Sequence, residues 1–204
     1  MIPDWATALE PAAPDIVAAW RGVEEGRFIS VRREVRRRAG AGSALAVATQ
    51  LDAVAIAIVA VIDALPDRAL YLPGGEEEWN VAQTVGHLAR SRAGLVVAAG
   101  LAASDRWPAD APTVIPGVPG PVADRQELIR KLGQSQRIIA RSADQIAGHE
   151  DAPCPLHHPL VGRLRCGEWL LFAGVHDLMH LEQLHAIRGS VASGDSAPDE
   201  GSSR

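Results

Sequence analysis

The sequence predicts an all-α protein, a four-helix bundle with one added helix ahead of it. Four long stretches repeat apolar residues at helical spacing, and no stretch shows a convincing strand alternation. A length of 204 residues suits one domain with a sizeable core. We therefore expect an N-terminal extension over residues 1–42, the bundle over residues 43–188 and a disordered tail, rich in Ser, Gly, Asp and Glu, over residues 189–204.

The extension is predicted to hold one amphipathic helix over Asp15–Arg38. Its apolar stripe consists of Ile16, Trp20, Val23, Val31 and Val35. Gly22 and Gly26 interrupt the helix and weaken it, because glycine is a poor helix former.

The first bundle helix is expected over Ala44–Leu65. Ser43 is a candidate N-cap after a glycine-containing breaker, and Pro66 ends the helix. Apolar residues fall on more than one side of this helix, namely Leu45, Leu51, Ile56, Val59 and Ile62. Such a helix is either central in a bundle or shared with a second subunit, and we expect a homodimer.

The same helix is the most membrane-like part of the chain. Gln50, Asp52 and Asp63 interrupt its apolar run, so we interpret it as a buried helix and expect no membrane partner. The first fifteen residues have acidic residues and prolines where a signal peptide needs a basic flank and an apolar run. These features predict a cytoplasmic protein.

Capping signals define the second and third helices. Asn80 followed by Gln83 is a capping box, and the helix after it has a core stripe of Val81, Val85, Leu88 and Leu95, with His87 at the flank of the stripe. A connection rich in Pro and Gly spans residues 105–121. Asp124 and Glu127 then form a second capping box, opening a helix that carries Leu128, Leu132 and Ile139. Another irregular stretch precedes the fourth helix, and we expect both stretches to be long crossings of the bundle.

The fourth helix, over residues 167–188, carries the most informative feature. His176 and His180 are four residues apart and share one helical face, so both imidazoles can reach the same point in space. That geometry suits a divalent metal, and His87 is the best candidate for a third ligand. Three neutral imidazoles bind Zn²⁺, Ni²⁺ or Fe²⁺ and leave coordination positions open. The alternative is a chance spacing, and His185 shows that this helix also carries a histidine off the site face.

The charge and the cysteine content limit the classes of partner that the protein is expected to bind. A net charge of −5 gives no general attraction to nucleic acid, and the arginine cluster between residues 32 and 38 is explained by a solvated helix face. Cys154 and Cys166 are twelve residues apart and form no CxxC motif, so we interpret them as structural thiols. A small-molecule substrate remains the expected partner.

Several motifs taken together resemble the DinB-like superfamily of damage-inducible and YfiT-related proteins, which is unrelated to the polymerase of that name. The resemblance rests on Trp79-Asn80, the helix with His87, His158-Pro159, Gly162, Glu168-Trp169, His176, His180 and Gln183. It spans roughly residues 44–188 and implies a four-helix bundle in which His87, His176 and His180 bind a metal. One departure is Arg165, which stands where the family usually has Ser or Thr as the N-cap of the last helix.

The resemblance also implies a function. In several branches a low-molecular-weight thiol such as mycothiol or bacillithiol is activated, so we expect a metal-dependent thiol transferase acting on a small electrophilic metabolite. The alternatives are a metal-dependent hydrolase or isomerase, and a non-catalytic ligand-binding dimer. Beyond the metal ligands we assign no catalytic residue. Gln183, His158 and Trp79 are candidate substrate-binding residues, although a structural role suits each of them as well.

Overall fold

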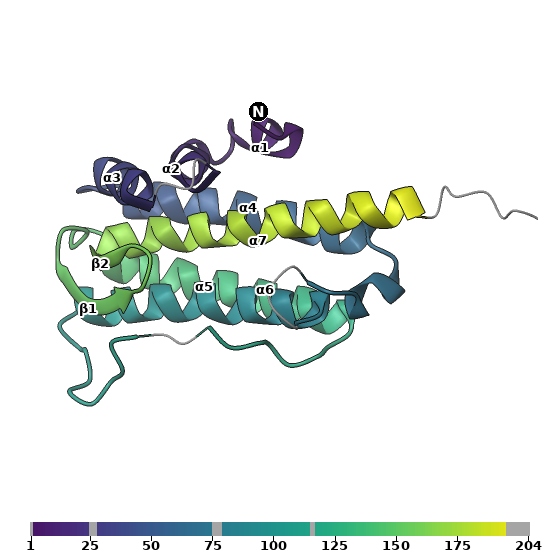
Figure 1. Cartoon of the computed structure of the whole chain (residues 1–204). Coiled ribbons are helices and arrows are strands. Elements are labelled where there is room, and N and C mark those ends of the chain that lie inside the picture. The colour runs from purple at the N-terminus through teal and green to yellow at the C-terminus, as the bar shows by residue number, and fades with distance from the viewer. Residues whose placement is uncertain (1, 25–27, 75–78, 115–116, 195–204) are drawn as a thin grey trace, which may run out of the picture.

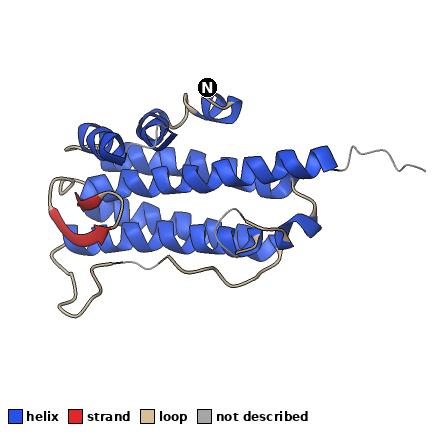
Figure 2. Ribbon diagram, viewed as in Figure 1, coloured by secondary structure: helices blue, strands red, loops and turns tan. Residues whose placement is uncertain are grey.

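The computed structural model describes residues 2–24, 28–74, 79–114 and 117–194. The all-α fold class is confirmed, because helices dominate and the described strands form one small hairpin (Figure 2). The elements in chain order are α1 (Asp4–Leu9), α2 (Pro14–Glu24), α3 (Phe28–Arg38), α4 (Ala44–Ala64), the short 3-10 helix η1 (Asp67–Tyr71), α5 (Val81–Ala103), α6 (Arg125–Ile146), β1 (Pro153–His158), β2 (Gly162–Arg165) and α7 (Cys166–Gly194).

The bundle consists of α4, α5, α6 and α7. Helices α4 and α5 each contact both α6 and α7, so the four helices enclose one core. The connection between α5 and α6 runs along the length of the bundle, which gives these two helices the same direction (Figure 1). This crossover carries a backbone segment past the side of α5 that holds His87.

The prediction that the stretch between α6 and α7 is a second long crossing of the bundle is wrong. Residues after α6 instead form an antiparallel hairpin at one end of the bundle, in which Pro153 pairs with Arg165 and His158 pairs with Gly162 (Figure 2). Gly162 adopts a φ of 70°, a left-handed conformation that glycine allows at the turn. The strand was missed because β1 is short and contains two prolines, which are tolerated only at sheet edges.

In its described residues the extension holds three helices, α1, α2 and α3, so the prediction of one added helix over Asp15–Arg38 is wrong. Helices α2 and α3 pack against each other, and they cover α4 and α7 from outside (Figure 1). Gly22 permits this packing, because a Cβ at that position would collide with the backbone of Val31. Gly174 of α7 similarly leaves room for Ile16. Of the two glycines predicted to weaken one long helix, Gly26 lies outside the described residues.

The start of α4 is capped by a distant residue. Ser43 occupies the N-cap position, but its hydroxyl makes no capping hydrogen bond, contrary to our expectation. A carboxylate oxygen of the buried Glu150 instead accepts the Ala44 N–H at 3.3 Å. The negative charge also suits the positive end of the helix dipole.

Helix α4 is strongly apolar, but its polar residues and its packing show that it is a core helix of the bundle. By length and composition α4 could cross a membrane. However, Gln50 is buried and caps α2, accepting the N–H groups of Asp15 and Ile16. The inner face of α4 packs against α6 and α7, so the helix is a core element of this fold.

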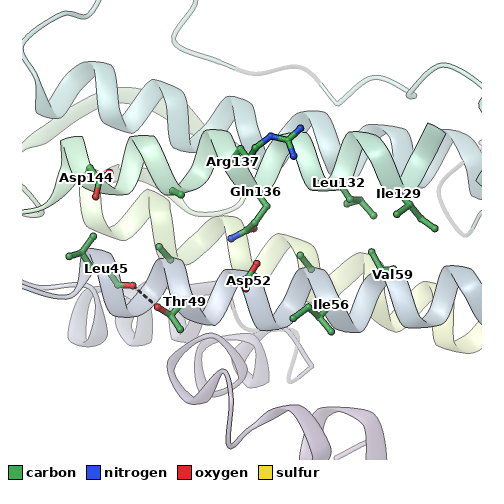
Figure 3. A pocket seen from close by; sticks show the side chains of 14 residues that line it. Leu45, Thr49, Asp52, Ile56, Val59, Ile129, Leu132, Gln136, Arg137 and Asp144 are labelled. Atoms are coloured by element: carbon green, nitrogen blue, oxygen red, sulfur yellow. Dashed lines mark hydrogen bonds between the residues drawn. The ribbon is translucent and has the colours of Figure 1, made fainter. Parts of the chain in front are cut away.

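A groove of about 800 Å³ lies between α4 and α6, on the outer side of the bundle (Figure 3). The side chains of Asp52 and Gln136 face one another across it from the two helices (Figure 3). Leu45 and Ile56, which are 55% and 65% exposed, add an apolar surface on α4. None of the three candidate ligands lines this groove.

Helix α7 is longer than expected. It continues to Gly194, so the first six residues of the predicted disordered tail are helical. Hydroxyl groups of Ser190 and Ser193 donate to carbonyls one turn earlier, which satisfies them within the helix. Residues 195–204 of the predicted tail lie outside the described residues.

Candidate metal centre

His87 is positioned by a helix start that the sequence specifies. The predicted capping box is confirmed, since the Asn80 side chain accepts the Gln83 N–H at 2.9 Å and the Gln83 side chain accepts the Asn80 N–H at 3.0 Å. These bonds place the first residue of α5 at Val81. His87 then lies in the second turn and is only 6% exposed.

His176 and His180 are positioned by the start of α7. The Arg165 N–H donates to the Glu168 carboxylate at 2.9 Å, so the glutamate caps the helix although Arg165 itself offers no acceptor. This half of a capping box places the helix start at Cys166, where the resemblance expects it. By contrast, only half of the box predicted before α6 forms: Asp124 accepts the Glu127 N–H, while the Glu127 carboxylate pairs with Arg130.

The three imidazoles converge. One ring nitrogen from each of His87, His176 and His180 lies within 4.8 Å of the others. The Nε2 atoms of His176 and His180 are 3.3 Å apart. Two nitrogens bound tetrahedrally at the usual zinc–nitrogen distance of about 2.0–2.1 Å would be separated by about 3.3 Å, so this spacing fits a metal ion.

Hydrogen bonds select the tautomer of two of these rings. Nδ1 of His87 lies 2.9 Å from the Val118 carbonyl oxygen, which can only accept, so Nδ1 carries the proton. Nδ1 of His180 lies 2.8 Å from the side-chain oxygen of Gln183, with the same consequence. Both Nε2 atoms therefore keep a lone pair for a metal, the arrangement that metal-binding histidines commonly show.

His176 is kept neutral by its surroundings. Burial lowers its pKa well below the ordinary value, and His180, His87 and His158 lower it further. Its Nδ1 is buried without a hydrogen-bond partner among the residues that the structure describes. A neutral imidazole is the form that binds a metal, so this environment favours ligation over protonation.

The crossover is held against α5 by two glycines. A Cβ on Gly120 would overlap the backbone of Gly86 and His87, and the Gly120 N–H donates to the Gln83 carbonyl at 3.0 Å. Arg90 fastens the same segment by donating to the Val118 carbonyl at 2.8 Å. This close contact sets the Val118 carbonyl beside His87.

The candidate substrate-binding residues surround the triad to different degrees. The Trp79 ring centroid lies 5.0 Å from that of His87. Gln183 hydrogen-bonds to His180 and so orients one of the candidate metal ligands. His158 packs its ring against Phe172 with centroids 5.1 Å apart, and it contributes to the depressed pKa of His176. His185 lies away from the triad and stacks on Trp5.

Sequence reasoning missed one pair beside the site. Arg92 of α5 and Asp177 of α7 form a fully buried ion pair, with Arg92 Nε 2.8 Å from an Asp177 oxygen. Arg92 also donates to the Leu51 carbonyl and to Gln136, which ties α5, α7, α4 and α6 together. Burial raises the pKa of Asp177 to about 6, against the opposing effect of Arg92. The available signal was a charged residue at a core position in each of two apolar helices.

Comparisons with known proteins agree with this architecture. No curated protein and no solved structure gives a significant match. A family model described as the DinB superfamily matches residues 50–184, which include all three candidate ligands and most of the four bundle helices. On the strength of that match, the bundle and the converging histidines, the chain belongs to the DinB superfamily.

Proposed function

We propose that the protein is a metal-dependent transferase that activates a low-molecular-weight thiol of the mycothiol type for reaction with a small electrophilic metabolite. The observation that carries the proposal is the convergence of His87, His176 and His180 with the Nδ1 protons of two of them already engaged. Membership of the DinB superfamily supports it.

The chemistry follows from the charge of the ligands. A Zn²⁺, Ni²⁺ or Fe²⁺ ion held by three neutral imidazoles would keep its double charge and lower the pKa of a thiol beside it from its usual value of about 8.5. The protein contributes neutral ligands, since the depressed pKa of His176 disfavours its protonation. His87 and His180 are almost fully buried, and Nδ1 of His176 is buried as well, so the three imidazoles are shielded from bulk water.

We expect His158, whose charge would act on His176, to orient a substrate at this centre. Its Nδ1 accepts the Leu160 N–H at 3.2 Å, so in the neutral ring the proton is on Nε2. Burial and the neighbouring His157 lower the pKa of His158, which favours this neutral form. His158 can therefore donate a hydrogen bond to a substrate, and Trp79 provides an aromatic wall against His87.

The placement of carboxylates favours thiol transfer over hydrolysis. A metal-dependent hydrolase usually needs a general base near the metal. Glu168 instead caps α7 and lies 3.5 Å from Arg36, two turns before His176. Glu182 is exposed, two residues beyond His180. A hydrolase or isomerase would have to use another group as its base.

The test follows consumption of mycothiol, bacillithiol and glutathione against a panel of electrophiles. We expect metal-loaded wild type to consume one thiol faster than the His180→Ala variant, with the His185→Ala variant as the matched control that keeps the rate. Metal-dependent cleavage of esters or amides without thiol consumption would establish the hydrolase instead. Binding of small molecules without turnover would leave only the ligand-binding alternative.

We also propose that a second copy of the chain covers the groove between α4 and α6. Its lining contains the exposed apolar residues Leu45 and Ile56. It also contains Asp52, Asp144 and Arg137, so two copies related by a two-fold axis can pair opposite charges across the contact (Figure 3). Large apolar residues on a helix face are typical of such interfaces.

A further inference from the structure

Part of the arginine cluster on α3 faces the hairpin. Arg32 and Arg36 are four residues apart, so they share one face of the helix. Nη2 of Arg32 donates to the Arg163 carbonyl of β2 at 3.5 Å, and Nε of Arg36 lies 3.5 Å from the carboxylate of Glu168 near the start of α7. By contrast, the Arg33 side chain on the same helix is 73% exposed. The solvated helix face expected for the cluster therefore holds for only part of it.

Two further arginines come from β2. Side chains alternate along a strand, so Arg163 and Arg165 lie on the same face while Leu164 between them is buried. The Arg165 guanidinium pairs with Asp151 at 2.6 Å. The Arg163 guanidinium makes no hydrogen bond and no ion pair with the part of the chain that the structure describes.

A cavity of about 420 Å³ lies among these groups. Its charged lining consists of Arg36, Arg163, Arg165 and Glu168, while Leu164 and two prolines of β1 supply apolar walls. Pockets that hold small molecules usually have volumes of about 300–1,000 Å³, so this cavity has room for a small organic ligand. It lies away from the metal centre, because Glu168 precedes His176 by eight residues, or about 12 Å along α7.

The cavity keeps an excess of positive charge. Three guanidinium groups line it, against the single carboxylate of Glu168. That carboxylate is buried and already caps α7, where it accepts the Arg165 N–H at 2.9 Å. Asp151 pairs with Arg165 from outside the lining, and no described residue compensates the charge of Arg163. An anion in the cavity would supply the missing countercharge.

We propose that this cavity binds a phosphate group, free or carried by a small molecule, with Arg163 and Arg36 as its principal ligands. A guanidinium group presents its N–H donors as a planar fork that matches phosphate oxygens. Arginines that approach from α3 and from β2 can donate to different oxygens of a tetrahedral anion. The proposal does not depend on the metal centre or on the proposed transferase activity.

The shape of the site and the charge of the whole protein favour a small phosphate over a polyanion. The cationic groups surround a cavity of limited volume instead of forming an extended stripe along the surface. The net charge of −5 repels nucleic acid and anionic membranes at longer range. The apolar walls suit the organic part of a phosphate monoester.

The experiment titrates the full-length, metal-free protein with inorganic phosphate and with phenyl phosphate in a calorimeter at low ionic strength. We expect saturable binding that weakens as salt is added. Phenyl phosphate should bind more tightly at pH 7 than at pH 5, because a phosphate monoester loses its second proton at about pH 6 while arginine stays charged. Tighter binding of phenyl phosphate than of inorganic phosphate would identify an organic monoester as the ligand, and equal affinities would identify the free ion.

Three variants locate the site. Arg163→Gln should weaken phenyl phosphate binding by about tenfold or more, the usual effect of losing a hydrogen bond to a charged group. Arg33→Gln is the matched control, since it removes the same charge from an exposed position outside the cavity and should keep the affinity. His180→Ala should also bind like wild type, which separates this result from the fate of the proposed transferase.

Four outcomes would overturn the proposal. They are the absence of saturable binding by wild type, wild-type affinity in Arg163→Gln, an equal loss in Arg33→Gln, and a loss in His180→Ala, which would place the anion at the metal centre. Tighter binding of a short single-stranded oligonucleotide than of phenyl phosphate would overturn it as well. The wild-type titration requires no variant, so a variant that fails to fold leaves the test intact.

Discussion

The Val118 carbonyl oxygen accepts a hydrogen bond from Nδ1 of His87 at 2.9 Å, although 31 residues separate them in the chain. This bond fixes the ring tautomer, so Nε2 keeps its lone pair in a ring that also contacts those of His176 and His180. The carbonyl belongs to the crossover between α5 and α6, so a loop backbone completes the environment of a helix-borne ligand.

Gly120 should be required for metal affinity. The Gly120→Ala variant adds a Cβ that overlaps the backbone of Gly86 and His87, which displaces the Val118 carbonyl. We expect metal affinity to fall by about 10- to 100-fold, the usual effect of losing a hydrogen bond behind a ligand. Calorimetric titration with Zn²⁺ measures it. Gly117→Ala is the matched control, since a Cβ there meets no atom within 4 Å. Equal affinities of the two variants would refute the role of the loop.

The triad should bind about one divalent ion per chain. His176→Ala or His180→Ala should abolish stoichiometric metal binding while helical circular dichroism stays largely unchanged, because each ligand is replaced by a strong helix former. His185→Ala should keep the metal, since His185 stacks on Trp5 away from the triad. The measurement is the metal content per chain after dialysis. Full metal retention in both ligand variants would exclude the site.

Arg92 and Asp177 should contribute strongly to stability as a pair. Replacing Asp177 by Asn leaves the buried Arg92 charge without its counterion, so the free energy of unfolding should fall by about 3–5 kcal/mol. Urea unfolding of Asp177→Asn, Arg92→Met and the double variant forms a double-mutant cycle. We expect the double variant to be more stable than Asp177→Asn. Additive losses would show that the two charges do not interact.

His185 should make stability depend on pH. Burial, and then the nearby Arg188, lower its pKa from 6.5 to about 4. Below pH 6.5 the unfolded chain binds a proton at His185 that the folded chain binds only near pH 4. The free energy of unfolding is therefore highest above pH 6.5, as far as this group is concerned, and it falls as the pH falls toward 4. His185→Phe keeps a ring on Trp5 but cannot titrate. Urea unfolding at pH 7 and pH 5 should therefore show a smaller loss for this variant than for wild type; equal losses would contradict the assignment.

The groove between α4 and α6 should mediate dimer formation. Ile56→Asp puts a charge on the exposed apolar face and should shift a dimer to a monomer at micromolar concentration, as light scattering would show. Val122→Asp is the control, because Val122 is similarly exposed but lies outside the groove. A monomeric wild type would refute the dimer.

Local patterns in the sequence predicted the helices well. The Asn80–Gln83 capping box, the helix start near Glu168 and the i, i+4 pair of His176 and His180 all depend on residues within about one helical turn. Local signals failed where a distant group replaced the expected one. Glu150, rather than Ser43, caps α4, and Gly22 allows α2 and α3 to pack as two helices.

The sequence by itself determined the all-α class, the helix that presents two imidazoles on one face, and the membership of His87 in the candidate set. Only the tertiary structure decided which tautomer His87 adopts and how Arg92 meets Asp177. These relationships join residues from separate elements, and their strength depends on burial and on distances of a few ångströms. Periodicity along the chain determines which face of a helix is apolar, whereas the packing of one element on another determines which atoms meet.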